Sequence, residues 1–211
     1  VERFRAEVGL QDPYIVENGG AIHGETPPMG AWQQALGPTW NELKPQLQGL
    51  AADLGEPLRA LDDLSESEGE HLLGLSGEGL LQAQRRCCSV PFLPPSESIR
   101  PRLQQLAARR KLAIVQGNRM AHLLGAGVSK GKALAVLKHR LGAHNVQVLG
   151  LGDSPNDLPL LEAADVAGVV PGHDGPHPAL REGVESGRFQ LAAFPHARGW
   201  ADAVRRNVLN R

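Results

Sequence analysis

The sequence predicts an α/β fold with a parallel, doubly wound core. The first observation is the alternation of helix and strand patterns through the C-terminal third of the chain. In order, these are a helix (130–141), a strand (146–151), a helix (158–164), a strand (166–170) and, after a loop, a helix (200–210). The second observation is the stretch at 146–151, in which Val146, Val148 and Leu149 predict a buried strand before two glycines break the pattern.

The first 24 residues predict a further helix and strand of this core. Apolar residues recur on one face of a helix over residues 1–10. A short strand is expected at 14–16, ended by the sequence Glu17-Asn-Gly-Gly20.

Residues 25–126 have a different texture and predict a separate small α/β unit. After a Pro/Gly-rich stretch, the expected elements are a helix (40–54), an acidic surface loop (62–70), a helix (78–86), a strand (88–93) and a helix (99–110). Two strands, 112–116 and 119–124, are joined at Gly117-Asn118, which is a strong signal for a two-residue hairpin turn.

Composition excludes several classes of partner. The chain has 211 residues and a formal net charge of −1, so no broad basic field favours nucleic acid. No apolar run approaches the roughly 18 residues that a membrane span needs, and no secretory signal pattern opens the sequence. Its two cysteines, Cys87 and Cys88, are adjacent and poorly placed to join distant segments. We therefore expect a cytoplasmic protein without a nucleic-acid or membrane partner.

The strongest functional signal is the acidic turn that follows the strand at 146–151. Asp153 and Asp157 lie four residues apart around Ser-Pro-Asn. Ligands of open α/β sheets bind at the carboxyl ends of strands. Two carboxylates and an amide there suit Mg²⁺, which takes oxygen ligands and usually also binds substrate phosphate. The simpler interpretation is a capped helix start with Asp153 or Ser154 as N-cap, for which one aspartate would suffice.

A second cluster of candidate residues lies at the start of the helix at 130–141. The sequence there is Ser129-Lys-Gly-Lys-Ala133. A helix N-terminus attracts anions through its free N–H groups and its dipole, and a lysine adds a full positive charge. This pattern favours a phosphate clamp. The alternative is a solvated lysine in the first turn, where its charge opposes the dipole.

The acidic turn resembles motif four of the haloacid dehalogenase superfamily of phosphatases, and the Lys-Gly-Lys segment resembles its motif three. The resemblance implies that Asp153 binds Mg²⁺, that Asp157 supports the metal shell and that Asn156 helps to hold the substrate or the lysine. It also implies that Lys130 neutralises the nucleophile and the phosphate, because the superfamily's lysine precedes the glycine. Lys132 is the alternative.

Over nearly its whole length the chain more closely resembles the mannosyl-3-phosphoglycerate phosphatases. The segments that carry this likeness are Ile15-Val-Glu-Asn-Gly-Gly-Ala-Ile22, Gln84-Arg-Arg-Cys-Cys-Ser-Val-Pro91, Gln116-Gly-Asn-Arg-Met-Ala-His122, 130–134, 149–162 and Gly199-Trp200. The family's architecture implies a haloacid dehalogenase-like Rossmannoid core formed by 1–24 and 127–211. It implies that residues 25–126 are an inserted α/β cap of type C2B, as in type IIB members.

The same resemblance implies substrate-binding residues in the cap, namely Arg86, Asn118 and Arg119. Guanidinium groups bind carboxylates and phosphates bidentately, and a glycosyl-phosphoglycerate carries both anions. Taken singly, each arginine has the simpler interpretation of an ordinary surface residue.

The family's activity implies Mg²⁺-dependent removal of phosphate from mannosyl- or glucosyl-3-phosphoglycerate through an aspartyl-phosphate. The superfamily's nucleophile lies in an Asp-x-Asp-x-Thr motif, and this sequence contains no Asp-x-Asp. We therefore expect the nucleophile upstream of Val1, in a longer protein of which this chain is an N-terminally truncated piece. Residues 1–211 alone are expected to be inactive.

Departures from the family pattern fall in the cap, which governs the choice of substrate. Val90 stands where the family has an acidic residue, Cys88 near where it has an aromatic one, Asn118 in place of a glycine and Met120 in place of an aromatic residue. The sequence therefore does not determine which sugar the substrate carries. Two further hypotheses remain: a non-catalytic sugar-phosphate-binding protein that lacks the nucleophile, and a type IIB sugar phosphatase of broader specificity.

Overall fold

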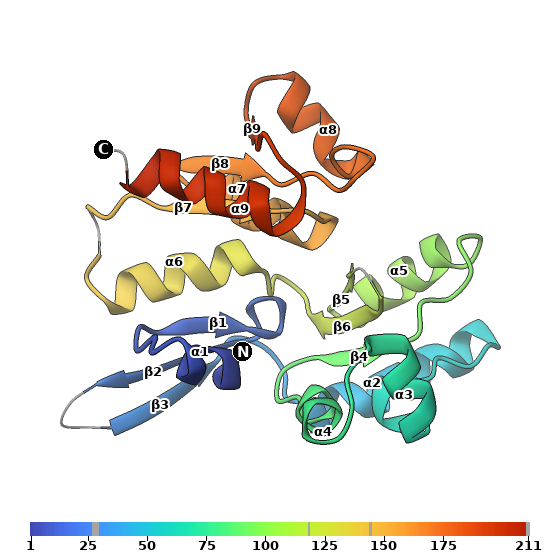
Figure 1. Ribbon diagram of the computed structural model, residues 1–211. Helices are drawn as coiled ribbons and strands as arrows, with labels where there is room; N and C mark the ends of the chain where they lie inside the picture. Colours follow the sequence, from blue (N-terminus) through green and yellow to red (C-terminus); the bar gives the residue numbers. More distant parts are fainter. Residues whose placement is uncertain (27–29, 118, 144, 210–211) are drawn as a thin grey trace. The chain divides into compact units, whose positions relative to one another are not determined.

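The computed structural model describes residues 1–26, 30–117, 119–143 and 145–209, whose path is shown in Figure 1. The chain divides into two compact units, residues 1–128 and residues 129–211. The predicted grouping of 1–24 with 127–211 around a cap stays a prediction. Among the described residues, no helix combines the length and the apolar character needed to cross a membrane.

A three-stranded antiparallel sheet in the order β1-β2-β3 opens the first unit. Its strands are β1 (Tyr14–Val16), β2 (Ala21–Thr26) and β3 (Gly30–Ala35). β1 confirms the predicted strand, whereas β2 and β3 occupy residues for which no strand was predicted. The indole ring of Trp32 lies on Gly24, where an added Cβ would be 2.4 Å from the ring. The packing of this ring therefore requires a glycine at position 24. Because glycine is a weak strand former, the sequence does not predict β2.

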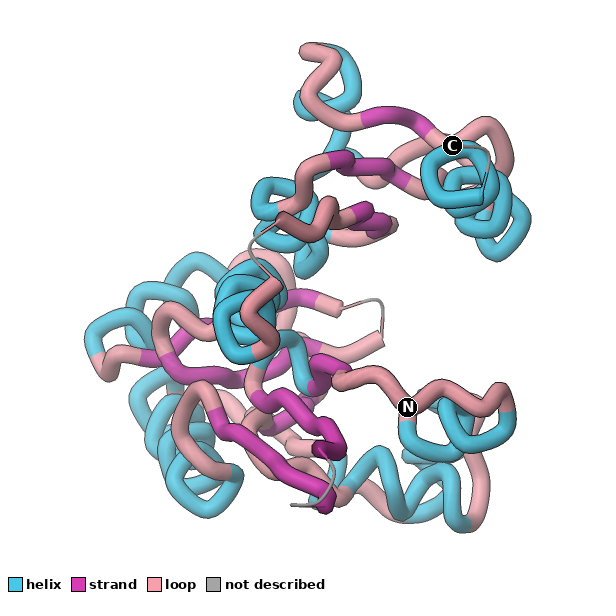
Figure 2. The backbone as a smooth tube through the Cα atoms, turned by 90° about the vertical axis from the view of Figure 1, so that its left-hand side faces the viewer, coloured by secondary structure: helices cyan, strands magenta, loops and turns pink. Residues whose placement is uncertain are grey.

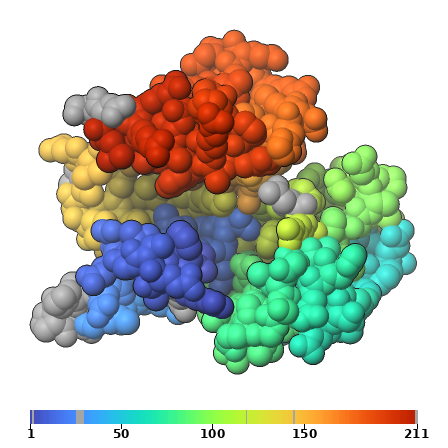
Figure 3. Space-filling view, in the orientation of Figure 1, coloured from blue at the N-terminus to red at the C-terminus, as the bar shows by residue number. Residues whose placement is uncertain are grey.

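The first helix, α1 (Glu2–Glu7), confirms the helix expected near the start of the chain and is shorter than predicted. Its apolar face, formed by Val1, Phe4 and Val8, is 70%, 63% and 52% exposed. Figure 3 shows this first segment, in dark blue, on the surface.

The second sheet of the first unit is antiparallel, in the order β4-β6-β5. Its strands, β4 (Val90–Phe92), β5 (Leu112–Gln116) and β6 (Ala121–Gly125), pack against the helices α2 (Trp40–Leu54) and α5 (Arg100–Arg109) (Figure 2). The core between them is aliphatic, with one aromatic ring, and includes Leu43, Leu47, Leu50, Phe92 and Leu123. The helices and strands predicted here are confirmed to within a few residues.

The predicted acidic loop at 62–70 is wrong, because most of this stretch is helical. It contains the 3₁₀ turn η2 (Leu61–Asp63) and most of the helix α3 (Glu66–Leu73), and α4 (Glu78–Gln84) follows. Ser65 and Glu68 form a capping box at the start of α3, with N–H···O distances of 2.8 Å and 3.3 Å. Hydrogen bonds from Arg59 and Ser65 lower the pKa of Glu68 to about 2.

The predicted two-residue hairpin turn is also wrong. Gln116 of β5 pairs with Ala121 of β6, so the connection spans residues 117–120. The Gly117 N–H donates to the Met120 carbonyl at 2.9 Å. Met120 is buried in a small apolar cluster and therefore lies in the connection rather than in the strand. Asn118 lies outside the described residues.

The second unit is the predicted parallel α/β core. Its sheet has the order β7-β8-β9, with both pairs parallel: β7 (Leu149–Gly152), β8 (Val166–Val169) and β9 (Gln190–Leu191). The helices are α6 (Lys130–Arg140), the 3₁₀ turn η3 (Pro155–Asp157), α7 (Leu158–Ala163), α8 (Pro178–Glu185), α9 (His196–Val204) and the π-helical turn η4 (Arg205–Leu209). A core of Leu161, Val169, Leu180 and Phe189 joins α7, β8 and α8.

Several elements of this unit differ from the prediction. α8 and β9 lie within the loop expected after residue 170, and the terminal helix begins at His196 rather than at 200. α8 buries Leu180 beside Phe189, and an added Cβ at Gly183 would lie 2.2 Å from the Phe189 ring. The prolines and glycines around this short helix obscure its apolar spacing in the sequence.

Candidate functional site

The acidic turn lies at the carboxyl end of β7. Gly152 ends the strand, and an added Cβ there would be 2.3 Å from the Cβ of Asp157. A glycine at this position therefore allows the turn to fold back, so that the Asp157 side chain lies against the strand end. Pro155 starts η3 and Asp157 precedes the first residue of α7. Local sequence thus places both aspartates at the edge of a parallel sheet where α/β proteins bind ligands.

Asp157 is the centre of this site. Its Oδ1 accepts a hydrogen bond from Lys130 Nζ at 2.5 Å. Its Oδ2 accepts from the N–H groups of Asp153 (3.0 Å) and Ser154 (3.2 Å) and from the Ser154 hydroxyl (3.1 Å). Burial acts to raise the pKa of Asp157, but the hydrogen bond and charge of Lys130, with the two N–H groups, outweigh it and lower that pKa.

Lys130 reaches Asp157 because α6 begins beside α7. The Ser129 hydroxyl caps α6 by accepting from the Lys132 N–H at 3.2 Å. Gly131 permits the close approach, since an added Cβ would lie 2.1 Å from the Pro159 carbonyl oxygen. The side chain of Lys130 is 28% exposed and that of Asp157 is 9% exposed, so the pair lies at the edge of the core. Of the two candidate lysines, the structure brings Lys130 to the acidic turn and leaves Lys132 exposed.

Asp153 is held by its backbone and leaves its carboxylate open. The residue is exposed, and its carboxylate makes no hydrogen bond or ion pair with the part of the chain that the structure describes. Asn156, in the same turn, is half-buried and accepts a hydrogen bond from the Ser154 hydroxyl. The turn therefore presents the free carboxylate of Asp153 near Lys130, whose charge is already neutralised by the buried carboxylate of Asp157.

The donor set fits Mg²⁺ better than a transition metal. Within the described ranges there is no group of three or more His, Cys, Asp or Glu side chains that could hold a metal ion. Mg²⁺ needs no such cage, because it is bound through one or two carboxylates and keeps waters and substrate phosphate as its other ligands. Asp153 is the carboxylate that could hold such an ion, with Asp157 fixing the turn behind it.

The predicted cap arginines both belong to the first unit. Arg86 follows α4 and is half-buried, and its Nε donates to the Ala83 carbonyl at 3.1 Å. Arg119 is exposed on the loop between β5 and β6 and donates to the carbonyl of Leu73, the last residue of α3. Burial lowers the pKa of the Arg86 guanidinium, and the negative charge of Glu17 partly opposes that shift.

Sequence reasoning missed Ser154 and the two site glycines as parts of this arrangement. Ser154 was considered only as a helix cap, yet its hydroxyl binds both Asn156 and Asp157. Gly131 and Gly152 lie directly next to Lys130 and Asp153 in the sequence. A glycine beside a candidate charged residue is a usable signal, because it often marks a close backbone approach.

Comparison with known proteins connects this site with a family. The model of the haloacid dehalogenase-like hydrolases matches residues 92–170, a range that contains Lys130, Asp153 and Asp157. The chain is 26% identical over 223 residues to the glucosyl-3-phosphoglycerate/mannosyl-3-phosphoglycerate phosphatase of Persephonella marina, an alignment that covers 100% of this chain and 80% of that protein. The family model thus spans the part of the chain that holds the site, and the alignment with the named phosphatase spans the whole chain.

Two solved structures of phosphatases share the fold. Sucrose-phosphatase from Synechocystis sp. PCC6803, solved in complex with sucrose and phosphate, aligns with a TM-score of 0.63 and 20% identity. The subclass IIB sugar phosphatase BT4131 aligns with a TM-score of 0.63 and 14% identity. Each alignment covers 97% of this chain and 78% of the other. The predicted haloacid dehalogenase-like α/β fold is confirmed. The hydrolase family model and the name of the Persephonella marina phosphatase agree with the predicted enzyme class, a phosphoric monoester hydrolase.

Proposed function

We propose that this chain belongs to a Mg²⁺-dependent phosphatase that removes phosphate from a glycosyl-3-phosphoglycerate and leaves the glycosylglycerate. The observation that carries the proposal is the 2.5 Å pair of Lys130 and Asp157 beside the free carboxylate of Asp153. A fixed cation and an open carboxylate at the end of a parallel strand suit a phosphoryl group and a divalent metal. The name of the Persephonella marina relative supports the substrate class.

In this proposal Lys130 and Asp157 act as a preorganised unit. Lys130 donates one of its three N–H bonds to Asp157, which leaves two for phosphoryl oxygens. Because Asp157 is itself held by three donors of the turn, the lysine does not have to reorient when negative charge develops on the phosphoryl group. Asn156 would hold the substrate or the lysine. Mg²⁺, bound in part by Asp153, would neutralise charge on the phosphoryl oxygens.

The reacting carboxylates of the proposed enzyme lie upstream of Val1. As the superfamily resemblance implies, an aspartate there attacks phosphorus, forming an aspartyl-phosphate as the bond from phosphorus to the leaving oxygen breaks. A second aspartate gives its proton to that oxygen and then takes one from water, whose attack on phosphorus releases phosphate. Lys130 and Asp157 supply positioning and charge.

Arg86 and Arg119 are proposed to bind other polar or anionic groups of the substrate, a role that a planar guanidinium suits. Asn118, which lies outside the described residues, is proposed to help them. The free cysteines Cys87 and Cys88 fit a reducing compartment, and we propose the cytoplasm.

The test measures phosphate release by the full-length protein. Mannosyl- and glucosyl-3-phosphoglycerate are compared with simple hexose phosphates, each with Mg²⁺ and with excess chelator. We expect Mg²⁺-dependent turnover with a clear preference for the phosphoglycerates. Equal turnover of hexose phosphates would instead indicate a broader sugar phosphatase. Binding of the phosphoglycerates without any turnover would indicate the non-catalytic protein, and a protein of residues 1–211 that turned over substrate would contradict the upstream nucleophile.

A further inference from the structure

Glu17 binds a segment of the first unit that lies about 70 residues further along the chain. It is the first residue of the short turn η1 (Glu17–Gly19), and its φ of +55° is unusual for a residue other than glycine. Its Oε1 accepts from the Cys87 N–H at 2.8 Å. Its Oε2 accepts from the Cys88 N–H at 2.9 Å and from the Ser89 hydroxyl at 2.8 Å. Three donors from consecutive residues thus converge on one carboxylate.

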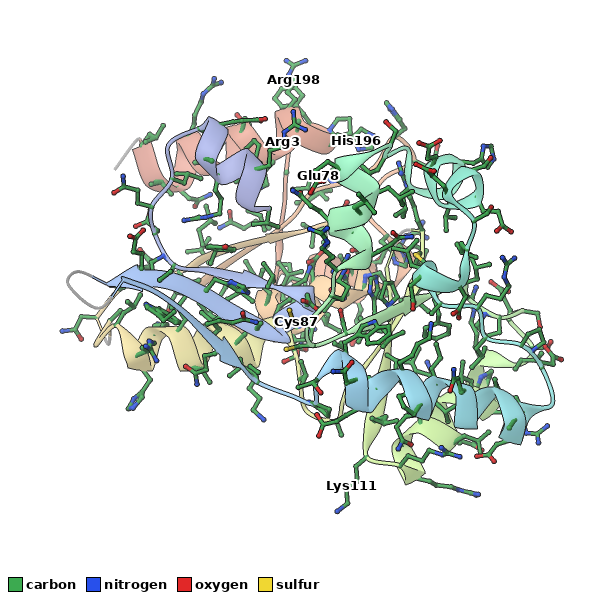
Figure 4. All side chains as sticks on the ribbon, turned by 90° about the horizontal axis from the view of Figure 1, so that it is seen from below. Arg3, Glu78, Cys87, Lys111, His196 and Arg198 are labelled. Atoms are coloured by element: carbon green, nitrogen blue, oxygen red, sulfur yellow. The ribbon has the colours of Figure 1, made fainter. Side chains whose placement is uncertain are left out.

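Cys88 and Ser89 of the bound segment are buried and closely packed, whereas Cys87 is exposed. Cys88 is 2% exposed and Ser89 is fully buried, and the segment leads directly into β4. An added Cβ at Gly20 would lie 2.9 Å from the Cβ of Cys88. The Cys87 carbonyl accepts from the Trp40 N–H at 2.7 Å. Figure 4 shows Cys87 at the end of the sheet formed by β1, β2 and β3. Glu17 therefore fixes residues 87–89 by accepting hydrogen bonds from backbone N–H groups of this segment, which would otherwise lack acceptors.

Arg86 comes immediately before this segment and is left without an ion pair. Among the described residues no carboxylate lies within 4.0 Å of its guanidinium, and its one recorded side-chain hydrogen bond is from Nε to the Ala83 carbonyl. The oxygens of Glu17 are already taken by residues 87–89. A half-buried guanidinium with both terminal nitrogens open is a binding group for a planar anion, because it can donate two parallel hydrogen bonds.

We propose that Glu17 is a positioning residue that fixes residues 87–89 and so presents the Arg86 guanidinium to the carboxylate of a phosphoglycerate. The proposal rests on the proposed function for the identity of the anion. In this role the two carboxylate oxygens of Glu17 accept hydrogen bonds from three donors of residues 87–89 and hold them in place. Glu17 does not itself touch the substrate.

The substitution Glu17→Gln tests this role with little change in size. Whichever way the amide points, one acceptor oxygen becomes an NH₂ group that faces an N–H or O–H donor. We expect the Kd of the full-length protein for 3-phosphoglycerate, measured by calorimetry, to rise about tenfold, because a charge-assisted contact behind Arg86 is lost. The Arg86→Ala variant is expected to raise Kd by a similar or larger factor. Ser89→Ala, which removes one donor without changing charge, is expected to give a smaller rise in the same direction.

The double variant separates positioning from general destabilisation. If Glu17 acts through Arg86, adding Glu17→Gln to Arg86→Ala changes Kd no further, whereas two independent effects would add. Glu78→Gln on the exposed side of α4 is the matched control and should leave Kd unchanged. Thermal unfolding checks that each variant is folded. If Glu17→Gln does not fold, the Kd of Ser89→Ala still tests the role of Glu17.

Each outcome decides between the proposals. Unchanged Kd in Glu17→Gln and Ser89→Ala, additive losses in the double variant, or no binding of 3-phosphoglycerate by the wild-type protein would overturn the role of Glu17. Binding that behaves as expected in a full-length protein without phosphatase activity would overturn the proposed function and leave the role of Glu17 in place.

Discussion

Two carboxylates organise the two units of this protein, and their charges are met in different ways. Asp157 in the second unit has Lys130 at 2.5 Å as well as three donors of its own turn. Glu17 in the first unit accepts from three donors and, among the described residues, forms no ion pair within 4.0 Å. In the first arrangement the carboxylate is paired with a lysine. In the second the carboxylate binds a backbone segment, and the neighbouring Arg86 forms no ion pair among the described residues. Variants at the acidic turn and at the start of α6 test the role of the first arrangement.

The largest expected effect is that of Asp153→Asn on turnover. In the full-length enzyme, loss of the open carboxylate should lower kcat by a factor on the order of 10³, because the metal would lose its ligand from this turn. The free energy of unfolding should change by less than about 0.5 kcal/mol, since the side chain is exposed and its carboxylate makes no hydrogen bond or ion pair with the described residues. Steady-state kinetics and urea unfolding measure the two quantities. Asp174→Asn, on the exposed loop after β8, is the control, and wild-type kcat in Asp153→Asn would remove Asp153 from the site.

Lys130→Met is expected to affect both catalysis and stability. It should lower kcat about 100-fold through the lost charge, and it should lower the unfolding free energy by about 2 kcal/mol because it leaves Asp157 buried without its cation. Lys132→Met, two residues away and exposed, should change neither kcat nor the unfolding free energy. If Lys132→Met were the damaging variant of the two, the assignment of the phosphate lysine would have to be reversed.

Gly131→Ala tests whether the lysine depends on close helix packing. The new Cβ would lie 2.1 Å from the Pro159 carbonyl oxygen, so α6 and α7 must separate. We expect a loss of about 1–3 kcal/mol of stability and a lower kcat, because Lys130 moves away from Asp157. Gly79→Ala is the matched control, since its Cβ would meet nothing closer than 3.9 Å. Unchanged thermal stability of Gly131→Ala would contradict the packing.

The smallest expected effect is the acid dependence of stability. The pKa of Asp157 is lowered in the folded state from its ordinary value of 3.8. Its contribution to stability is therefore fully present above that value and is lost as the pH falls below it towards the folded-state pKa. Urea unfolding of the wild-type protein and of Asp157→Asn between pH 5 and pH 3 measures the difference. The two proteins should converge on acidification, and a gap that widened instead would mean that the pKa is raised.

Some of these features are visible in the sequence because their parts lie close together along the chain. The acidic turn, its glycine and the following helix fall within Gly152 to Ala163, and the lysine precedes a helix that the apolar spacing predicts. The helix α3 was also recoverable, since Ser65 and Glu68 have capping-box spacing. The contact of Glu17 with residues 87–89 was not, because nothing local in either segment identifies its partner. β2 was hidden for a similar reason: the ring of Trp32 determines the need for Gly24.

The most direct test of the phosphate site is a crystal structure of the full-length protein grown with Mg²⁺ and inorganic phosphate. We expect electron density for the metal at the Asp153 carboxylate, and a phosphate oxygen within hydrogen-bonding distance of Lys130 Nζ while that lysine still contacts Asp157. A metal bound elsewhere, with Asp153 turned to solvent and Lys130 without phosphate, would contradict the assignment of these three residues.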